Sequence, residues 1–160
     1  MESADSYILS KIRWQIFGGL SYPTPNCSEQ RRMRAIFALF RSTAKDFYVH
    51  FPDLPWCVRL ERGPIGGALH NHFVFAGLPD EAVCSTTCAT MMERWKQRFG
   101  GTESKIELFD PSQCGLDYLS KGLGFEPLVG WGGLNRAELD LRYSDAVWNP
   151  NNHFRTSVDN

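Results

Sequence analysis

The chain has 160 residues, of which 42% are hydrophobic and 22% are charged, so it suits a folded domain and is not an intrinsically disordered chain. This length leaves no room for a second domain such as a nucleotide-driven motor. The formal net charge of −1 excludes a protein that is basic over its whole surface, so any contact with nucleic acid must depend on local basic clusters.

The cysteines and the apolar segments of the chain indicate a reducing compartment. The five cysteines are odd in number and irregularly spaced, which favours small buried thiols over a disulfide framework. No apolar run approaches the roughly eighteen residues that a membrane helix requires, and the N-terminus lacks the basic-then-apolar order of a signal peptide. We therefore expect a cytoplasmic protein with no membrane partner.

The first third of the chain predicts a strand followed by a helix. Residues 12–20 are rich in Ile, Trp, Phe and Leu and run into a loop with two prolines, which favours a buried strand. Residues 28–45 predict a helix with Ser28 as its N-cap. Its apolar stripe consists of Met33, Ile36, Phe37 and Phe40. The basic cluster on its other face consists of Arg31, Arg32, Arg34 and Arg41. Such a cluster is as compatible with a solvated helix face as with contact to nucleic acid.

Two segments of alternating polarity around a glycine-rich turn predict a β-hairpin. Residues 56–62 alternate with a period of two, which places Glu61 on the polar side of the first strand. Residues 68–76 read as the returning strand, with His70 and His72 on one face. The tight turn between the strands is expected to bring the carboxylate opposite the two imidazoles.

The rest of the chain predicts two further helices and a strand. Residues 80–99 predict the longest helix, and residues 103–109 predict a short strand. The basic cluster of that helix consists of Arg94, Lys96 and Arg98. A third helix is predicted over residues 110–122, with Asp110 as its N-cap and a proline in the first helical position. The pattern as a whole predicts a single α+β domain over residues 1–160.

The predicted hairpin carries residues suited to binding a metal ion. Two histidines separated by one residue in a strand project from the same face about 6 to 7 Å apart, close enough to share an ion. Glu61 on the partner strand would complete a set of His70, His72 and a carboxylate. Such a set suits Mg²⁺, Mn²⁺ or Zn²⁺ and leaves coordination positions for a substrate. An isolated His-x-His is equally often a pair of polar residues on an exposed strand face.

The predicted third helix carries a tyrosine with a lysine on the same face. Tyr118 and Lys121 are three residues apart, so an ammonium group would lie next to the phenol. A neighbouring cation favours the nucleophilic phenolate and can donate a proton to a leaving oxygen. Taken alone, a tyrosine packed on the core with a lysine reaching to solvent is the more common arrangement. Combined with the metal ligands, the pair indicates attack on a phosphodiester.

These residues together resemble the HUH endonucleases. The segment HNHFVFAG, residues 70–77, is similar to their His-hydrophobic-His motif, and Glu61 occupies the upstream acidic position that often supplies a third ligand. YLSK, residues 118–121, resembles the catalytic Tyr-x-x-Lys of the single-tyrosine replication initiators, and IFGGLSYP, residues 16–23, resembles the family's first motif. The resemblance spans residues 14–124 and is greatest to the Rep proteins of rolling-circle plasmids and single-stranded DNA viruses.

The resemblance implies both a fold and a reaction. The fold would be an antiparallel sheet of about five strands flanked by helices. Mg²⁺ or Mn²⁺ would be held by Glu61, His70 and His72, while Tyr118, assisted by Lys121, would attack one DNA strand. The products would be a 5′-phosphotyrosine link and a free 3′-hydroxyl, and reversal would rejoin the ends without a nucleotide cofactor. Such nicking would initiate rolling-circle DNA replication.

The chain departs from the family pattern in the middle of its histidine motif. Asn71 is polar, whereas the family usually has an apolar residue at this position. A buried amide without hydrogen-bond partners would be costly. Asn71 is therefore expected either to be partnered or to lie on a face of the sheet that contacts solvent.

The partners implied by the resemblance are nucleic acids and proteins that process them. The substrate would be single-stranded DNA at an origin or a hairpin, and a separate helicase would supply unwinding. The aromatic residues that could stack on unpaired bases are Phe47, Tyr48, Trp131 and Trp148. A transposase or a mobilisation relaxase would use the same chemistry. A protein of this kind from a eukaryotic virus would act in the nucleus.

A non-enzymatic alternative uses the cysteines. Cys84 and Cys88 are one helical turn apart and could join His50 or His153 in a zinc site. In that case the protein would be a zinc-stabilised binding module, in which Tyr118 serves only for packing. Because the chain has no second close cysteine pair, buried thiols are favoured over this zinc site.

Overall fold

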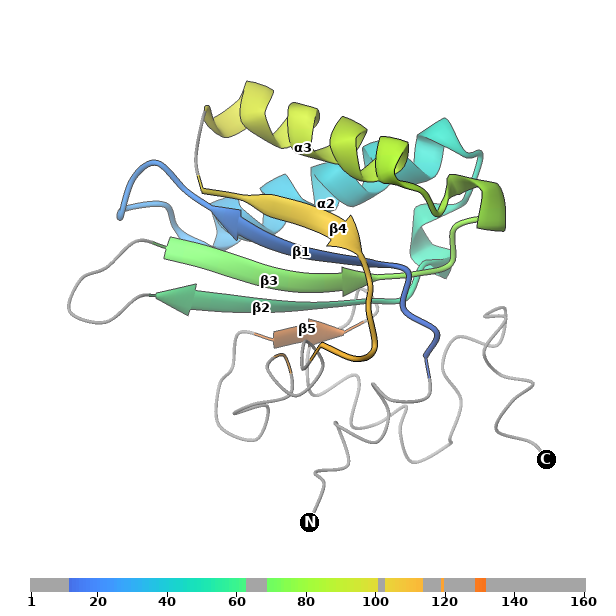
Figure 1. Ribbon diagram of the computed structural model, residues 1–160. Coiled ribbons are helices and arrows are strands. Elements are labelled where there is room, and N and C mark those ends of the chain that lie inside the picture. The colour runs from blue at the N-terminus through green and yellow to red at the C-terminus, as the bar shows by residue number, and fades with distance from the viewer. Residues whose placement is uncertain (1–11, 63–68, 101–102, 114–118, 120–128, 132–160) are drawn as a thin grey trace, which may run out of the picture.

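The computed structural model describes residues 12–62, 69–100, 103–113, 119 and 129–131. In chain order the elements are β1 (Ile16–Ser21), α2 (Glu29–Asp46), the 3-10 turn η1 (Phe51–Asp53), β2 (Trp56–Arg62), β3 (Leu69–Phe75), the 3-10 turn η2 (Asp80–Ala82), α3 (Ser85–Phe99), β4 (Lys105–Leu108) and β5 (Val129–Trp131). The two α-helices of this part of the chain lie on one face of the sheet (Figure 1). The predicted α+β class is confirmed.

The described strands form one antiparallel sheet in the order β4-β1-β3-β2-β5. The central strand, β3, pairs with β1 on one side and with β2 on the other. The β2–β3 hairpin predicted from the sequence is confirmed, and β2 has the predicted bounds. Because β3 lies between two partners, the side chains on its two faces are held in a fixed alternation.

The hydrophobic core fills the space between the sheet and the two helices. The sheet contributes Ile16, Leu20, Trp56, Val58, Leu60, Leu69, Phe73 and Phe75, while the helices contribute residues such as Ile36, Phe40, Met91 and Trp95. The Phe40 ring stacks on Phe75 at 4.7 Å between centroids and contacts Phe73 edge-on at 5.1 Å. The predicted apolar stripe of α2 therefore faces the sheet, as its helical spacing indicated.

Helix α2 begins where its sequence predicts but does not expose all of its basic residues. The Ser28 side chain accepts a hydrogen bond from the backbone N–H of Arg31 at 3.2 Å, which confirms the predicted N-cap. Arg31 is exposed, whereas Arg32 is only 4% exposed. The prediction that these arginines share one polar face was therefore wrong for Arg32, whose side chain is buried between α2 and the sheet.

The segment predicted as the longest helix is divided in two. Residues 80–82 form the turn η2, and α3 begins only at Ser85. Cys84 between them has an extended backbone with φ −148° and ψ 165°. The turn allows Ala82 to be fully buried before the helix starts. Helix α2, with 18 residues, is therefore longer than α3, with 15.

Three strands are shorter than predicted and one was not predicted. Strand β1 begins at Ile16 rather than residue 12, β3 ends at Phe75 rather than residue 76, and β4 covers only part of residues 103–109. Strand β5 pairs with Cys57, Val58 and Arg59 of β2. A strand of three residues is too short to give a periodic pattern in the sequence.

The start of the predicted third helix is a turn. The Asp110 carboxylate accepts hydrogen bonds from the backbone N–H and the hydroxyl of Ser112, at 2.9 and 2.7 Å. Most of residues 114–122 lie outside the described residues, but Leu119 is helical and fully buried. In the described part of the chain, no helix combines the length and the apolar composition that crossing a lipid bilayer requires.

Candidate metal centre

The strand pairing places the three predicted metal ligands together on the face of the sheet opposite the helices. Glu61 of β2 and His70 of β3 are direct cross-strand partners, and Arg59 is the partner of His72. The residues that alternate with them, such as Leu60, point into the core. Because a slip of one residue would bury the polar set, packing on the helix side fixes the orientation of the ligands on the other side.

The three side chains form a compact group of ligand atoms. The Glu61 Oε2 atom lies 2.7 Å from His70 Nε2 and 3.7 Å from His72 Nε2. The imidazole rings are 5.3 Å apart and nearly perpendicular. One ligand atom from each residue lies within 4.8 Å of the others, and this is the one such group of three or more His, Cys, Asp or Glu found in the described residues.

The group could hold a metal ion and still leave coordination positions for a ligand that is not part of the protein, such as a substrate. All three side chains are partly exposed: 14% for Glu61, 30% for His70 and 22% for His72. A carboxylate and two imidazoles match the preferences of several divalent ions. Three protein ligands leave coordination positions open, which is the arrangement of catalytic rather than structural metal sites.

Arg59 belongs to the same group, although the sequence analysis did not assign it to the site. Its Nε atom lies 2.7 Å from Glu61 Oε1, and its side chain is 9% exposed. The guanidinium therefore engages one carboxylate oxygen, while the other oxygen faces the histidines. A ligand carboxylate held in this way would bind an ion through a single oxygen. The alternation of β2 could have identified Arg59, because it lies on the same face as Glu61.

Burial lowers the pKa of His72. Desolvation is the main cause that lowers the pKa of His72 below its usual 6.5, and Glu61 opposes this shift without reversing it. In the metal-free protein we expect the His72 imidazole to titrate below pH 6.5, as measured by NMR of its ring protons. Because unfolding restores the usual pKa, the stability that His72 contributes is present above pH 6.5 and lost as the pH falls from there to the folded-state pKa. A titration at or above pH 6.5 would contradict this.

Asn71 lies between the two histidines but points to the opposite, buried face. It is fully buried, donates a hydrogen bond to the Tyr22 hydroxyl and accepts one from Arg32 Nη1 at 3.3 Å. The expectation that this amide is partnered if it is buried is confirmed. The long-range partners of Asn71 could not be deduced from the residues around it.

The predicted nucleophile and its assisting lysine are not placed. Tyr118 and Lys121 lie outside the described residues. Their neighbour Leu119 is fully buried. The described residues thus bring together the metal-binding half of the predicted site, and the roles of Tyr118 and Lys121 stay predictions.

The residues of the zinc alternative are not brought together with His50. Cys84 and Cys88 are free thiols, and in the described residues they belong to no candidate metal group. His153 lies outside the described residues. Burial raises the pKa of the Cys88 thiol, while the hydrogen bond between the Cys84 thiol and the Thr87 hydroxyl lowers the pKa of Cys84.

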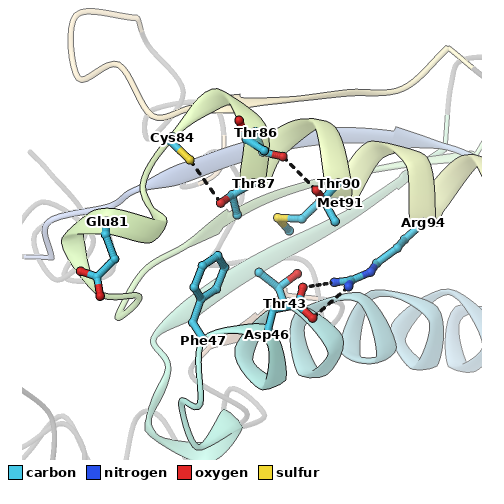
Figure 2. A pocket seen from close by; sticks show the side chains of 10 residues that line it. All are labelled: Thr43, Asp46, Phe47, Glu81, Cys84, Thr86, Thr87, Thr90, Met91 and Arg94. Carbon is cyan, nitrogen blue, oxygen red and sulfur yellow. Dashed lines mark hydrogen bonds and ion pairs between the residues drawn. The ribbon is translucent and has the colours of Figure 1, made fainter.

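A separate pocket of about 190 Å³ lies between the end of α2 and the start of α3 (Figure 2). Cys84 and Thr87 line one side, and Asp46 and Arg94 form an ion pair at 2.7 Å on another. None of the predicted metal ligands lines this pocket. The ion pair also neutralises one member of the second basic cluster.

The aromatic residues considered for base stacking differ in their surroundings. Tyr48 is 98% exposed, with a left-handed backbone at φ 57°. Phe47 is partly buried and packs against the core. Trp148 and the side chain of Trp131 lie outside what the structure describes. Tyr48 is therefore the one of the four that is seen to offer a free ring surface.

Comparison with known proteins leaves the candidate metal centre to be judged from its own geometry. No protein-family model, no curated protein and no solved structure matches this chain at a significant level. The resemblance to the HUH endonucleases is therefore carried by the residue patterns alone.

Proposed function

We propose that this protein is a metal-dependent endonuclease that nicks and rejoins single-stranded DNA through a covalent link to Tyr118 and so initiates rolling-circle replication. Glu61, His70 and His72 hold Mg²⁺ or Mn²⁺ in this proposal, and Lys121 assists the nucleophile. The observation that carries it is the cluster of two imidazoles and one carboxylate, with ligand atoms within 4.8 Å, that the β2–β3 hairpin exposes on one face of the sheet.

The charge of the cluster fits a phosphodiester substrate. The Arg59 guanidinium already balances the Glu61 carboxylate. A divalent cation bound by the two imidazoles and Glu61 would therefore give the site a net positive charge. A positive, partly exposed site attracts the singly charged phosphate of a DNA backbone and stabilises the extra negative charge of the transition state.

The nucleophile is assigned partly by comparing tyrosines. Burial raises the pKa of Tyr22 far above its usual value of 10, so this phenol stays protonated in the core. Tyr48 is exposed, but it follows the C-terminus of α2. Arg32, which contacts the backbone of Glu61, lies in the first turn of that helix, about 20 Å away along its axis. Tyr118 has a lysine three residues after it, in the Tyr-x-x-Lys order, which neither Tyr22 nor Tyr48 has.

The proposed reaction is an exchange of phosphodiester bonds. The Tyr118 oxygen forms a bond to phosphorus, while the bond between phosphorus and the 3′-oxygen breaks. The phenol proton passes to solvent, and Lys121 donates a proton to the departing 3′-oxygen. The reverse attack by a 3′-hydroxyl restores the DNA and frees the tyrosine, and this balance needs no external energy source.

The test is the formation of a covalent adduct. The full chain is incubated with a pool of labelled single-stranded oligonucleotides and Mn²⁺, and the products are separated on a denaturing gel. The wild type is expected to give a labelled protein band, whereas Tyr118→Phe gives none. Tyr48→Phe is the matched control and should behave like the wild type. Retention of the adduct by Tyr118→Phe, or its absence in the wild type with every oligonucleotide, would contradict the proposal.

A further inference from the structure

Three polar side chains meet in the core directly behind the candidate metal centre. Arg32 of α2 is 4% exposed, Tyr22 after β1 is 4% exposed, and Asn71 of β3 is fully buried. They lie on the helix side of the sheet, whereas the metal ligands lie on the other side. The proposed reaction does not use any of the three.

Arg32 links both ligand-bearing strands through a single nitrogen. Its Nη1 atom donates to the backbone carbonyl of Glu61 at 3.2 Å and to Asn71 Oδ1 at 3.3 Å. The first contact holds β2 at the residue that supplies the carboxylate. The second holds β3 between its two histidines.

Tyr22 completes the network from a third element. Its hydroxyl accepts a hydrogen bond from the Asn71 side chain, and its ring lies 5.9 Å from the Arg32 guanidinium carbon. The same ring packs edge-on against Trp95 and Phe99 of α3, with centroids 5.3 and 5.1 Å away. The network is therefore anchored to both helices as well as to the central strand.

Stability alone does not account for this arrangement. In the described part of the chain, no carboxylate forms an ion pair with Arg32, and its buried Nε has no hydrogen-bond partner. Burying a guanidinium without a counter-charge is costly, and well-packed apolar residues often give equal or greater stability. What the network supplies in addition is a fixed register of the two strands at the ligand positions.

We propose that Arg32, Asn71 and Tyr22 are positioning residues of the metal centre, which hold the backbones of Glu61 and of the histidine strand so that the three ligand atoms converge on one ion. This inference rests on the proposed metal site. The residues act from behind the sheet and touch neither the ion nor the DNA. The ligands of a metal site commonly depend on such outer contacts for their orientation.

The test separates metal affinity from stability. Mn²⁺ binding to the full chain is measured by electron paramagnetic resonance at a temperature where each variant is folded, and thermal unfolding is measured in parallel. The double variant Arg32→Met/Asn71→Leu replaces the two partners with apolar side chains. We expect its unfolding midpoint to stay close to that of the wild type, while its Kd for Mn²⁺ rises about tenfold.

Two single variants keep the test decisive if the double variant does not fold. Tyr22→Phe removes only a hydroxyl and should raise the Kd by a smaller factor. Thr43→Val is the matched control, because it removes a buried hydrogen bond to Leu39 elsewhere in α2 and should leave the Kd unchanged. Wild-type Kd values in a folded double variant, or in Tyr22→Phe where the double variant does not fold, would overturn this inference alone. A wild type that binds no Mn²⁺ would overturn the metal site and this inference together.

Discussion

Replacement of either His70 or His72 by alanine is expected to lower Mn²⁺ affinity by about a hundredfold or more and to abolish DNA nicking. Each imidazole is one of the three candidate ligands in the described residues, so its loss would leave two. Loss of outer contacts alone typically weakens metal binding about 10- to 100-fold, and a direct ligand should matter at least as much. Binding is measured by Mn²⁺ titration and nicking by the gel assay on the same preparations.

Two further variants make this prediction specific to the centre. Glu61→Gln keeps the size of the side chain but removes its charge, so both the ion pair with Arg59 and the ligand strength should weaken. His50→Ala changes an exposed histidine outside the candidate group and should leave binding and nicking unchanged. If His70→Ala and His72→Ala retained wild-type binding and cleavage, the metal assignment would have to be abandoned.

Gly18→Ala is expected to destabilise the fold by about 3 kcal/mol, the upper end of the usual cost of overpacking a core. A Cβ atom at Gly18 would lie 2.1 Å from Cε1 of Phe73. The Phe73 ring is fully buried and contacts Phe40, so it has little room to shift. The free energy of unfolding, measured by chemical denaturation, should fall accordingly.

The next residue provides the matched control. A Cβ atom at Gly19 would point to the other face of the sheet and lie 3.5 Å from the His72 ring, which is an ordinary contact. Gly19→Ala should therefore change stability far less than Gly18→Ala. Equal losses in the two variants would show that the general preference of strands against glycine, rather than the Phe73 contact, determines the cost.

The local parts of this structure could be predicted from the sequence because they depend on local periodicity. The alternation in residues 56–62 fixes which side chains share a face, and the antiparallel pairing of β2 with β3 places Glu61 opposite His70. The N-cap at Ser28 likewise depends on contacts within one helical turn. Strand alternation and the pairing of two consecutive strands were sufficient to assemble the candidate ligand set.

The remaining features depend on contacts between distant residues. The sequence pattern assigned Arg32 to a polar helix face. Its side chain is buried instead, because it donates a hydrogen bond to Asn71, which is thirty-nine residues away in the sequence. The role of Arg59 depends on the orientation of the Glu61 carboxylate, which no spacing rule specifies. Strand β5 and the division of residues 80–99 are likewise set by tertiary packing, which overrides local propensity.

The ion pair between Arg59 and Glu61 has a consequence for the order of folding and metal uptake. Because the carboxylate has its own counter-ion within the chain, its charge is balanced before any metal arrives. Folding then does not have to wait for metal, in contrast to small zinc modules that are unfolded without it. In such a protein the divalent cation would bind reversibly: it would bind when the substrate is present and dissociate without unfolding the sheet.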